Sequence, residues 1–278
     1  LVARGWGKCC IVGCADLQIS FQDKTLSANG TVLQEGDWLT LNGSNGNVYK
    51  GTIPLKEVDL NTNTYFQTFM GIVDTYKKLG VRANADSPED AKQAREFGAE
   101  GIGLCRTEHM FFDPERISAM REMIVAESET ARREAIMKLL PHQKKDFYGI
   151  LKAMAPHPVT IRLLDPPLHE FLPQEKEQID KLAKELQITP NELNIRIENL
   201  HELNPMLGHR GCRLGISYPE ITEMQARAIF EATTELVREK KSPFPEIMVP
   251  LVGTVMEFIH QKKLIDNMAE TVKKETGV

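Results

Sequence analysis

Gly101-Ile102-Gly103-Leu104-Cys105-Arg106-Thr107-Glu108 is the stretch of sequence that decides the fold. Its apolar, glycine-rich first part is typical of a short strand buried on both faces, because such strands are nearly continuous apolar runs. Arg106 ends this predicted strand. A buried guanidinium without an anionic partner is costly, so Arg106 needs either a neighbouring carboxylate or an anionic ligand.

The same pattern recurs further along the chain. Val159-Thr160-Ile161-Arg162-Leu163-Leu164-Asp165 is a second apolar strand with Arg162 near its end, and Asn204-Pro205-Met206-Leu207-Gly208-His209-Arg210-Gly211 places Arg210 in a glycine-flanked turn. For one isolated arginine, a structural ion pair is an equally good explanation. The recurrence favours a phosphate-binding cluster, because planar guanidinium groups match phosphate oxygens bidentately.

Strand and helix patterns alternate from residue 81 onward. Strands are predicted at 81–86, 101–106, 158–165 and 247–252. The helices predicted between and after them are 88–97, a long helical region from 114, and 143–154, 176–186, 190–200, 219–240 and the segment from 254. Ser87 followed by Pro88 is typical of a helix start. Strands alternating with helices indicate βαβ units and a parallel sheet.

The first 55 residues are rich in turns and short strand patterns. Asn29-Gly30, Asn42-Gly43 and Asn45-Gly46 predict tight turns, because Asn and Gly tolerate positive φ. We therefore expect β-hairpins here, and a domain boundary near residue 55. The predicted organisation is a β-rich domain over 1–55, a linker and helix over 56–80, and an α/β domain over 81–278.

Composition excludes several classes of protein. The chain has 278 residues, 41% hydrophobic and 26% charged, with a formal net charge of −5, which argues against a general binder of nucleic acid or acidic membranes. No apolar run approaches the roughly 20 residues that span a bilayer. Five cysteines are too few for a disulfide framework, and Cys9, Cys10 and Cys14 match no zinc-ligand spacing. We expect a reducing, cytoplasmic location, with a plastid or other organelle left open.

The chain begins at Leu1 without an initiator methionine or a signal-peptide layout. We therefore expect it to be a segment of a longer polypeptide.

Three motifs resemble the phosphoenolpyruvate-binding barrel of the pyruvate, phosphate dikinase family: GIGLCRTEHMFF at 101–112, TIRLLDPPLHEFLP at 160–173 and NPMLGHRGCRLG at 204–215. VARGWGKCCIVG at 2–13 resembles the segment just after that family's phosphorylated histidine. The resemblance covers essentially the whole chain. It implies an incomplete (β/α)8 TIM barrel of about five β/α units, preceded by the C-terminal part of a swivelling phosphohistidine domain.

The resemblance also implies roles for residues. Arg106, Arg162 and Arg210 would hold the phosphate of phosphoenolpyruvate and neutralise the transferring phosphoryl group, at the face formed by the C-terminal ends of the strands. Magnesium is implied as cofactor, with ligands on later strands outside this chain, so we assign no metal ligand. Pyruvate and phosphoenolpyruvate are the implied substrates here, ATP and phosphate would bind a domain absent from this chain, and the full-length enzyme would be a homodimer.

Other residues near the motifs have open roles. Four polar residues are candidates for orienting the guanidinium groups, with a purely structural role equally open: Thr107, Glu108, Asp165 and Asn204. Arg82 is a further possible source of positive potential. Cys105 and Cys212 are expected to pack rather than react, and His209 is expected to be a hydrogen-bonded loop residue.

The implied overall reaction interconverts ATP, phosphate and pyruvate with AMP, diphosphate and phosphoenolpyruvate through a phosphohistidine. Phosphoenolpyruvate synthase and Enzyme I of the sugar phosphotransferase system are alternatives, since they share the strand motif and the later arginines. The loop at 166–171 and the turn at 208–213 favour the dikinase. An alternative of another class is a truncated, non-catalytic binding module.

We predict that these 278 residues alone do not turn over phosphoenolpyruvate, because the implied phosphohistidine and metal ligands lie outside them. A coupled assay of pyruvate release from phosphoenolpyruvate checks this. Detectable turnover would mean that the missing catalytic groups are wrongly assigned.

Overall fold

The computed structural model describes residues 8–55, 62–186, 188–201, 204 and 206–278, and the chain divides into two compact units, Leu1–Lys77 and Lys78–Val278. Parts of three sequence predictions lie outside the described residues: the start of the N-terminal motif at 1–7, the linker at 56–61, and Pro205 in the third arginine motif.

The first unit contains short antiparallel strands and one helix. The strands are β1 (Gln18–Ser20), β2 (Thr25–Ala28), β3 (Thr31–Gln34), β4 (Leu39–Asn42) and β5 (Asn47–Lys50). β1, β2 and β3 form one sheet, and β4 pairs with β5 in another. Asn29 and Gly30 join β2 to β3 with φ of 49° and 77°, which confirms the predicted turn. Helix α2 (Thr64–Tyr76) follows. That residues 1–55 end a swivelling domain stays a prediction.

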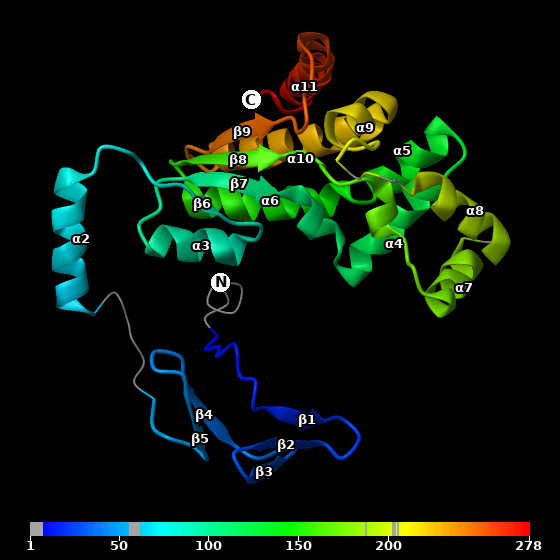
Figure 1. Ribbon diagram of the computed structural model, residues 1–278. Helices are drawn as coiled ribbons and strands as arrows, with labels where there is room; N and C mark the ends of the chain where they lie inside the picture. Colours follow the sequence, from blue (N-terminus) through cyan, green and yellow to red (C-terminus); the bar gives the residue numbers. More distant parts are fainter. Residues whose placement is uncertain (1–7, 56–61, 187, 202–203, 205) are drawn as a thin grey trace. The chain divides into compact units, whose positions relative to one another are not determined.

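The second unit is built on a parallel sheet. Its strands are β6 (Ala83–Asn84), β7 (Ile102–Arg106), β8 (Pro158–Arg162) and β9 (Phe244–Met248), hydrogen-bonded in that order (Figure 1). Every pairing is parallel, and Arg106, Arg162 and Met248 are register partners at the C-terminal end. The predicted α/β class with a parallel sheet is confirmed.

The predicted number of units was too high, since the described residues contain four parallel strands where about five units were expected. β8 pairs directly with β9, and helix α9 (Gly211–Ser217) forms where the sequence suggested only a turn. The last strand also begins and ends earlier than predicted. Leu251 has a φ of 57°, and the carbonyl of Pro250 accepts a hydrogen bond from α9, so these residues leave the strand ladder.

One face of the sheet is covered by helices. α3 (Pro88–Glu96), α6 (Leu140–Met154) and α10 (Pro219–Arg238) pack against it, and Ser87 caps α3 as predicted. The core between the layers includes Ile102, Cys105, Val159 and Ile161 from the strands and Phe147, Ile150, Ala228 and Ile229 from the helices. On β8 the alternate residues Val159 and Ile161 therefore face the helices. On β7 the register shifts between Ile102 and Cys105, so both face the helices although they are three positions apart.

The remaining elements of this unit follow the strands or complete its outer layer. They are η1 (Thr107–Phe111), α4 (Pro114–Val125), α5 (Glu129–Met137), η2 (Leu168–Phe171), α7 (Lys176–Glu185), α8 (Pro190–Leu200) and α11 (Val255–Thr276). Phe111 and Phe171 pack edge to face, with ring centroids 6.2 Å apart. The segments after β7 and β8 are thus joined by a second apolar cluster. Among the described residues, no helix combines the length and apolar character needed to cross a membrane.

The crossing of α3 and α6 depends on Gly149. A Cβ at this position would lie 2.6 Å from Cγ and 2.9 Å from Cβ of Pro88, whose ring cannot turn aside. Alanine normally stabilises a helix relative to glycine by about 0.5–1 kcal/mol. We expect Gly149→Ala to lower the free energy of unfolding instead, by about 1–2 kcal/mol, because overpacking outweighs helix propensity.

Urea unfolding followed by far-ultraviolet circular dichroism measures this effect. Gly71→Ala is the matched control, because Gly71 also lies in a helix and has no atom within 4 Å of its added Cβ. It should leave stability equal or higher. Equal effects of the two substitutions would contradict the proposed clash.

Candidate functional site

The three arginines predicted from the sequence lie at one edge of the parallel sheet. Arg106 and Arg162 are the last residues of β7 and β8 and are register partners. Arg210 immediately precedes α9. Their side chains are 37%, 21% and 14% exposed, in that order. The structure therefore brings them together at the C-terminal ends of the strands, where parallel α/β folds bind ligands.

Asp165 lies between two of these arginines. Its Oδ2 is 2.9 Å from Nη2 of Arg210 and 3.2 Å from Nη1 of Arg162. Nη2 of Arg162 donates to Glu108 in the turn after β7. The backbone carbonyl of Asp165 also accepts a hydrogen bond from Nε of Arg210, at 3.1 Å. These contacts form a continuous series from Glu108 to Arg210 that holds both guanidinium groups in place.

The other two candidates for orienting the arginines behave differently. Thr107 is fully buried, and its hydroxyl has no hydrogen-bond partner among the described residues. Asn204 uses its side-chain oxygen to accept a hydrogen bond from the backbone of Met206, at 3.0 Å. That contact stabilises its own turn, so Asn204 shapes the segment before Arg210 without a described contact to a guanidinium.

Asp86 is a residue of the site that sequence analysis missed. It follows β6 and accepts hydrogen bonds from the backbone N–H of Arg106 at 2.7 Å and from its Nη2 at 2.6 Å. Nδ1 of His109 lies 2.8 Å from the same carboxylate. The hydrogen bond that Arg106 donates to Asp86 holds the pKa of Arg106 above its ordinary value, against the effect of burial. An acid as the last residue of a predicted strand was the available signal, since Asp86 ends the predicted strand 81–86 as Asp165 ends the predicted strand 158–165.

Polar atoms without a partner gather at this edge. Among the described residues, Nε of Arg162, Oε2 of Glu108 and Oδ1 of Asp165 are buried and form no hydrogen bond. In the more exposed Arg106, Nε and Nη2 bind Asp86, and none of the described hydrogen bonds uses Nη1. Buried polar groups are normally satisfied, so such a cluster marks a place where a polar ligand or water binds. Unused N–H groups on guanidinium ions suit an anionic oxygen.

The turn that carries Arg210 needs a glycine after it. Gly211 has a φ of 56°, and a Cβ there would lie 3.1 Å from both Leu251 and the carbonyl of Pro250. Its N–H donates to the carbonyl of Asp165 at 3.0 Å, and the N–H of Cys212 donates to Pro250 at 2.9 Å. The segments after β8 and β9 are thereby tied to the start of α9.

Arg82, which the sequence left open as a further source of positive potential, has its described contacts away from the cluster. It precedes β6 and binds Glu246, with a further hydrogen bond to Thr160. Thr160 and Glu246 are paired two positions before the strand ends. The hydrogen bond from Arg82, then that from Thr160, lowers the pKa of Glu246 from its ordinary value of 4.5.

The two cysteines near the arginines are buried, as expected. Cys105 points toward the covering helices, and burial, assisted by the charges of Asp86 and Glu108, raises the pKa of its thiol. Burial also raises the pKa of Cys212. Both side chains are therefore thiols at neutral pH, which suits packing rather than nucleophilic chemistry.

The described residues do not fit a magnesium site. In this part of the chain, no three His, Cys, Asp or Glu side chains are grouped so that they could hold a metal ion. Asp86, Glu108 and Asp165 each bind an arginine. We therefore derive no chemical step that passes through a metal on these residues.

A family model described as PEP-utilising enzyme, PEP-binding domain, matches residues 61–278. The chain is 55% identical to the chloroplastic pyruvate, phosphate dikinase of Mesembryanthemum crystallinum, over 100% of this chain and 29% of that protein. It is 54% identical to pyruvate, phosphate dikinase 2 of Zea mays and 51% identical to the pyruvate, phosphate dikinase of Rhizobium meliloti (strain 1021), covering 32% and 31% of those proteins and all of this chain. The chain thus spans between 29% and 32% of the length of these curated relatives.

The ion pair of Glu246 predicts a pH dependence of stability. A carboxyl group whose pKa is lowered on folding stabilises the protein above its unfolded pKa, and this contribution disappears as the pH falls through the folded pKa. Glu246→Gln should lower the free energy of unfolding at about pH 7 by about 1 kcal/mol or less, since both partners are partly exposed.

Urea unfolding of wild type and Glu246→Gln at several pH values measures this difference. It should shrink as the pH falls below the ordinary carboxyl pKa of 4.5. A difference that stays constant into acid would contradict the assigned cause.

Proposed function

The chain belongs to the family of phosphoenolpyruvate-utilising enzymes and is a homologue of pyruvate, phosphate dikinase, and from this premise we propose that its arginine cluster binds the phosphate of phosphoenolpyruvate. The parallel sheet is then the first part of a (β/α)8 barrel. Arg106, Arg162 and Arg210 hold the phosphoryl group as it moves between a phosphohistidine and the enolate of pyruvate.

One observation carries the proposal: three guanidinium groups meet at the C-terminal edge of the sheet, and two of them share Asp165. Each guanidinium is planar and has five N–H donors. A carboxylate that binds one side of it fixes its orientation, and the remaining donors stay available for phosphate oxygens. Asp86 does this for Arg106, and Glu108 and Asp165 do it for Arg162.

Phosphoryl transfer suits such a site, because it depends mainly on positioning and on stabilising charge at the transferring group. Arginines held in advance need little reorganisation during the reaction, which is the source of their catalytic effect. Arg106 and Arg162 approach from adjacent strands, and Arg210 approaches from the start of α9. Together they neutralise the phosphoryl oxygens from different directions.

The complete reaction belongs to the full-length enzyme. We propose that it interconverts ATP, phosphate and pyruvate with AMP, diphosphate and phosphoenolpyruvate through a phosphohistidine, as a homodimer with magnesium bound by residues outside this chain. A requirement for inorganic phosphate separates this activity from those of phosphoenolpyruvate synthase and Enzyme I.

Arg162→Ala in the full-length enzyme tests the assignment. We expect transfer from the phosphoenzyme to pyruvate to fall about a hundredfold or more, because a donor to the transferring group is lost. Formation of the phosphoenzyme from ATP and phosphate should be unchanged. The two half-reactions are measured separately with radiolabelled phosphoryl donors, and an unchanged rate on the pyruvate side would reject the proposal.

Arg132→Ala is the matched control. It also breaks an ion pair, because Arg132 binds the carboxylate of Glu220, whose side chain is 1% exposed. Loss of a buried partner destabilises the protein in both variants. Only Arg162→Ala should impair the pyruvate half-reaction, so equal losses would indicate a general effect of unfolding.

A further inference from the structure

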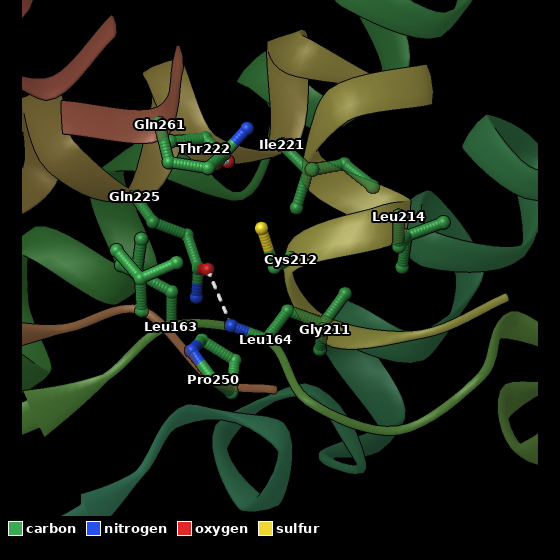
Figure 2. A pocket seen from close by; sticks show the side chains of 12 residues that line it. Leu163, Leu164, Gly211, Cys212, Leu214, Ile221, Thr222, Gln225, Pro250 and Gln261 are labelled. Atoms are coloured by element: carbon green, nitrogen blue, oxygen red, sulfur yellow. Dashed lines mark hydrogen bonds between the residues drawn. The ribbon is translucent and has the colours of Figure 1, made fainter. Parts of the chain in front are cut away.

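Two buried glutamines form a hydrogen-bonded link between segments of the arginine cluster. Oε1 of Gln225 on α10 accepts the backbone N–H of Leu164 at 2.9 Å, a bond shown in Figure 2. Nε2 of Gln225 donates to Oε1 of Gln143 on α6 at 3.3 Å, and Nε2 of Gln143 contacts the sulfur of Met110 at 3.7 Å. Gln225 is 0% and Gln143 1% exposed.

We propose that Gln225 is a positioning residue for phosphoryl transfer, which acts by fixing the backbone between Arg162 and Asp165. The proposal rests on the function proposed above. Gln225 contacts neither guanidinium nor carboxylate of the cluster in the described contacts; it acts through the peptide group of Leu164.

The position of Leu164 gives this one bond its importance. Leu164 follows Arg162 by two residues and precedes Asp165, the carboxylate that binds Arg162 and Arg210. Its neighbours are held by backbone bonds: the N–H of Leu163 donates to Met248, and the carbonyl of Asp165 accepts from Gly211. At Leu164 itself a side chain supplies the acceptor.

Removal of that acceptor would leave a buried peptide N–H without a partner, which is unfavourable. The peptide group can regain a partner only by rotating, and rotation would move the residues on either side. A shift of Asp165 would change the separation of the Arg162 and Arg210 guanidinium groups. Effects of this kind on reacting geometry reduce rates strongly even when stability changes little.

The second glutamine extends the link to the other arginine-bearing strand. Gln143 contacts Met110 in η1, the turn that contains Glu108, which binds Arg162. The N–H of Leu164 determines how the Gln225 amide is oriented. This donor requires the side-chain oxygen of Gln225 as its acceptor, so the amide nitrogen of Gln225 turns toward Gln143. The segments after β7 and β8 are therefore connected by a buried polar path as well as by apolar packing.

The surroundings of Gln225 determine which substitution is informative. It lines a cavity of about 10 Å³ together with Cys212, Thr222 and Gln261 (Figure 2). Truncation to alanine would enlarge this cavity and admit water that could replace the lost acceptor. Methionine keeps the length of the side chain and removes the amide, so Gln225→Met is the appropriate variant.

Gln261, which lines the same cavity, offers a matched control. It is also a buried glutamine, 1% exposed, and its side-chain oxygen accepts from the hydroxyl of Thr222 at 2.8 Å. None of its described hydrogen bonds reaches the segment between Arg162 and Asp165. Gln261→Met therefore reproduces the loss of a buried amide without the loss at Leu164.

The experiment uses the full-length enzyme and measures single-turnover transfer from the phosphoenzyme to pyruvate. We expect Gln225→Met to slow this transfer about tenfold to a hundredfold, with phosphoenzyme formation from ATP unchanged. Gln261→Met should keep both rates within about twofold of wild type. Thermal unfolding of each variant shows whether their stabilities are comparable. A transfer rate for Gln225→Met that matches wild type, or equal slowing by the two variants, would overturn the proposal.

Gln225→Glu provides a rescue that a purely structural role would not predict. The carboxyl group keeps an oxygen that accepts from Leu164, and the amide of Gln143 can turn to donate to the other oxygen. Transfer should be at least about tenfold faster than in Gln225→Met, and equally slow transfer would overturn the proposal. If Arg162→Ala does not slow transfer to pyruvate, the proposed function fails. If Arg162→Ala slows this transfer and the Gln225 variants do not, the proposed function stands and the positioning role of Gln225 is rejected.

Discussion

The site depends on the neutralisation of closely spaced positive charges by carboxylates that lie among them. Adjacent strands are about 4.8 Å apart, so arginines that end neighbouring strands would repel each other if they were alone. Asp86, Glu108 and Asp165 provide one negative charge for each of Arg106, Arg162 and Arg210. Because Asp165 binds two of the arginines, it holds together groups that come from distant parts of the chain.

This charge balance affects how a phosphate would bind. An anion that enters the cluster gains contacts with guanidinium groups that are already paired, so the net gain is smaller than for bare cations. In the proposed function, such a site favours exact orientation of the phosphoryl group over very tight binding, which suits a group that arrives and leaves in each cycle. In the positioning role proposed above, Gln225 serves the same requirement, because its side chain binds the backbone of Leu164 next to Asp165 and is itself bonded to Gln143.

Features of this fold that depend on local sequence were predictable, and those that depend on register were not. The Asn29-Gly30 turn and the Ser87 cap follow from the backbone preferences of those residues. Asp86 reaches Arg106 because β6 and β7 are neighbours in a particular register; the sequence predicts a parallel sheet but neither the pairing of these two strands nor their register. Helix α9 was missed because it is short and contains Gly211 and Gly215, which have low helix propensity, so its packing must stabilise it.

Gly211 links the third arginine to the last strand of the sheet. Its backbone contacts the loop after β9 closely, and the adjacent N–H of Cys212 bonds to Pro250 in that loop. The turn before α9 therefore lacks its supporting surface until β9 has docked, although β7 and β8 already carry their arginines. β9 contributes no arginine, yet its docking supplies the surface that supports Arg210 and so completes the cluster of three guanidinium groups. Affinity for an anion would therefore arise when the sheet closes during folding, instead of growing with each arginine-bearing strand.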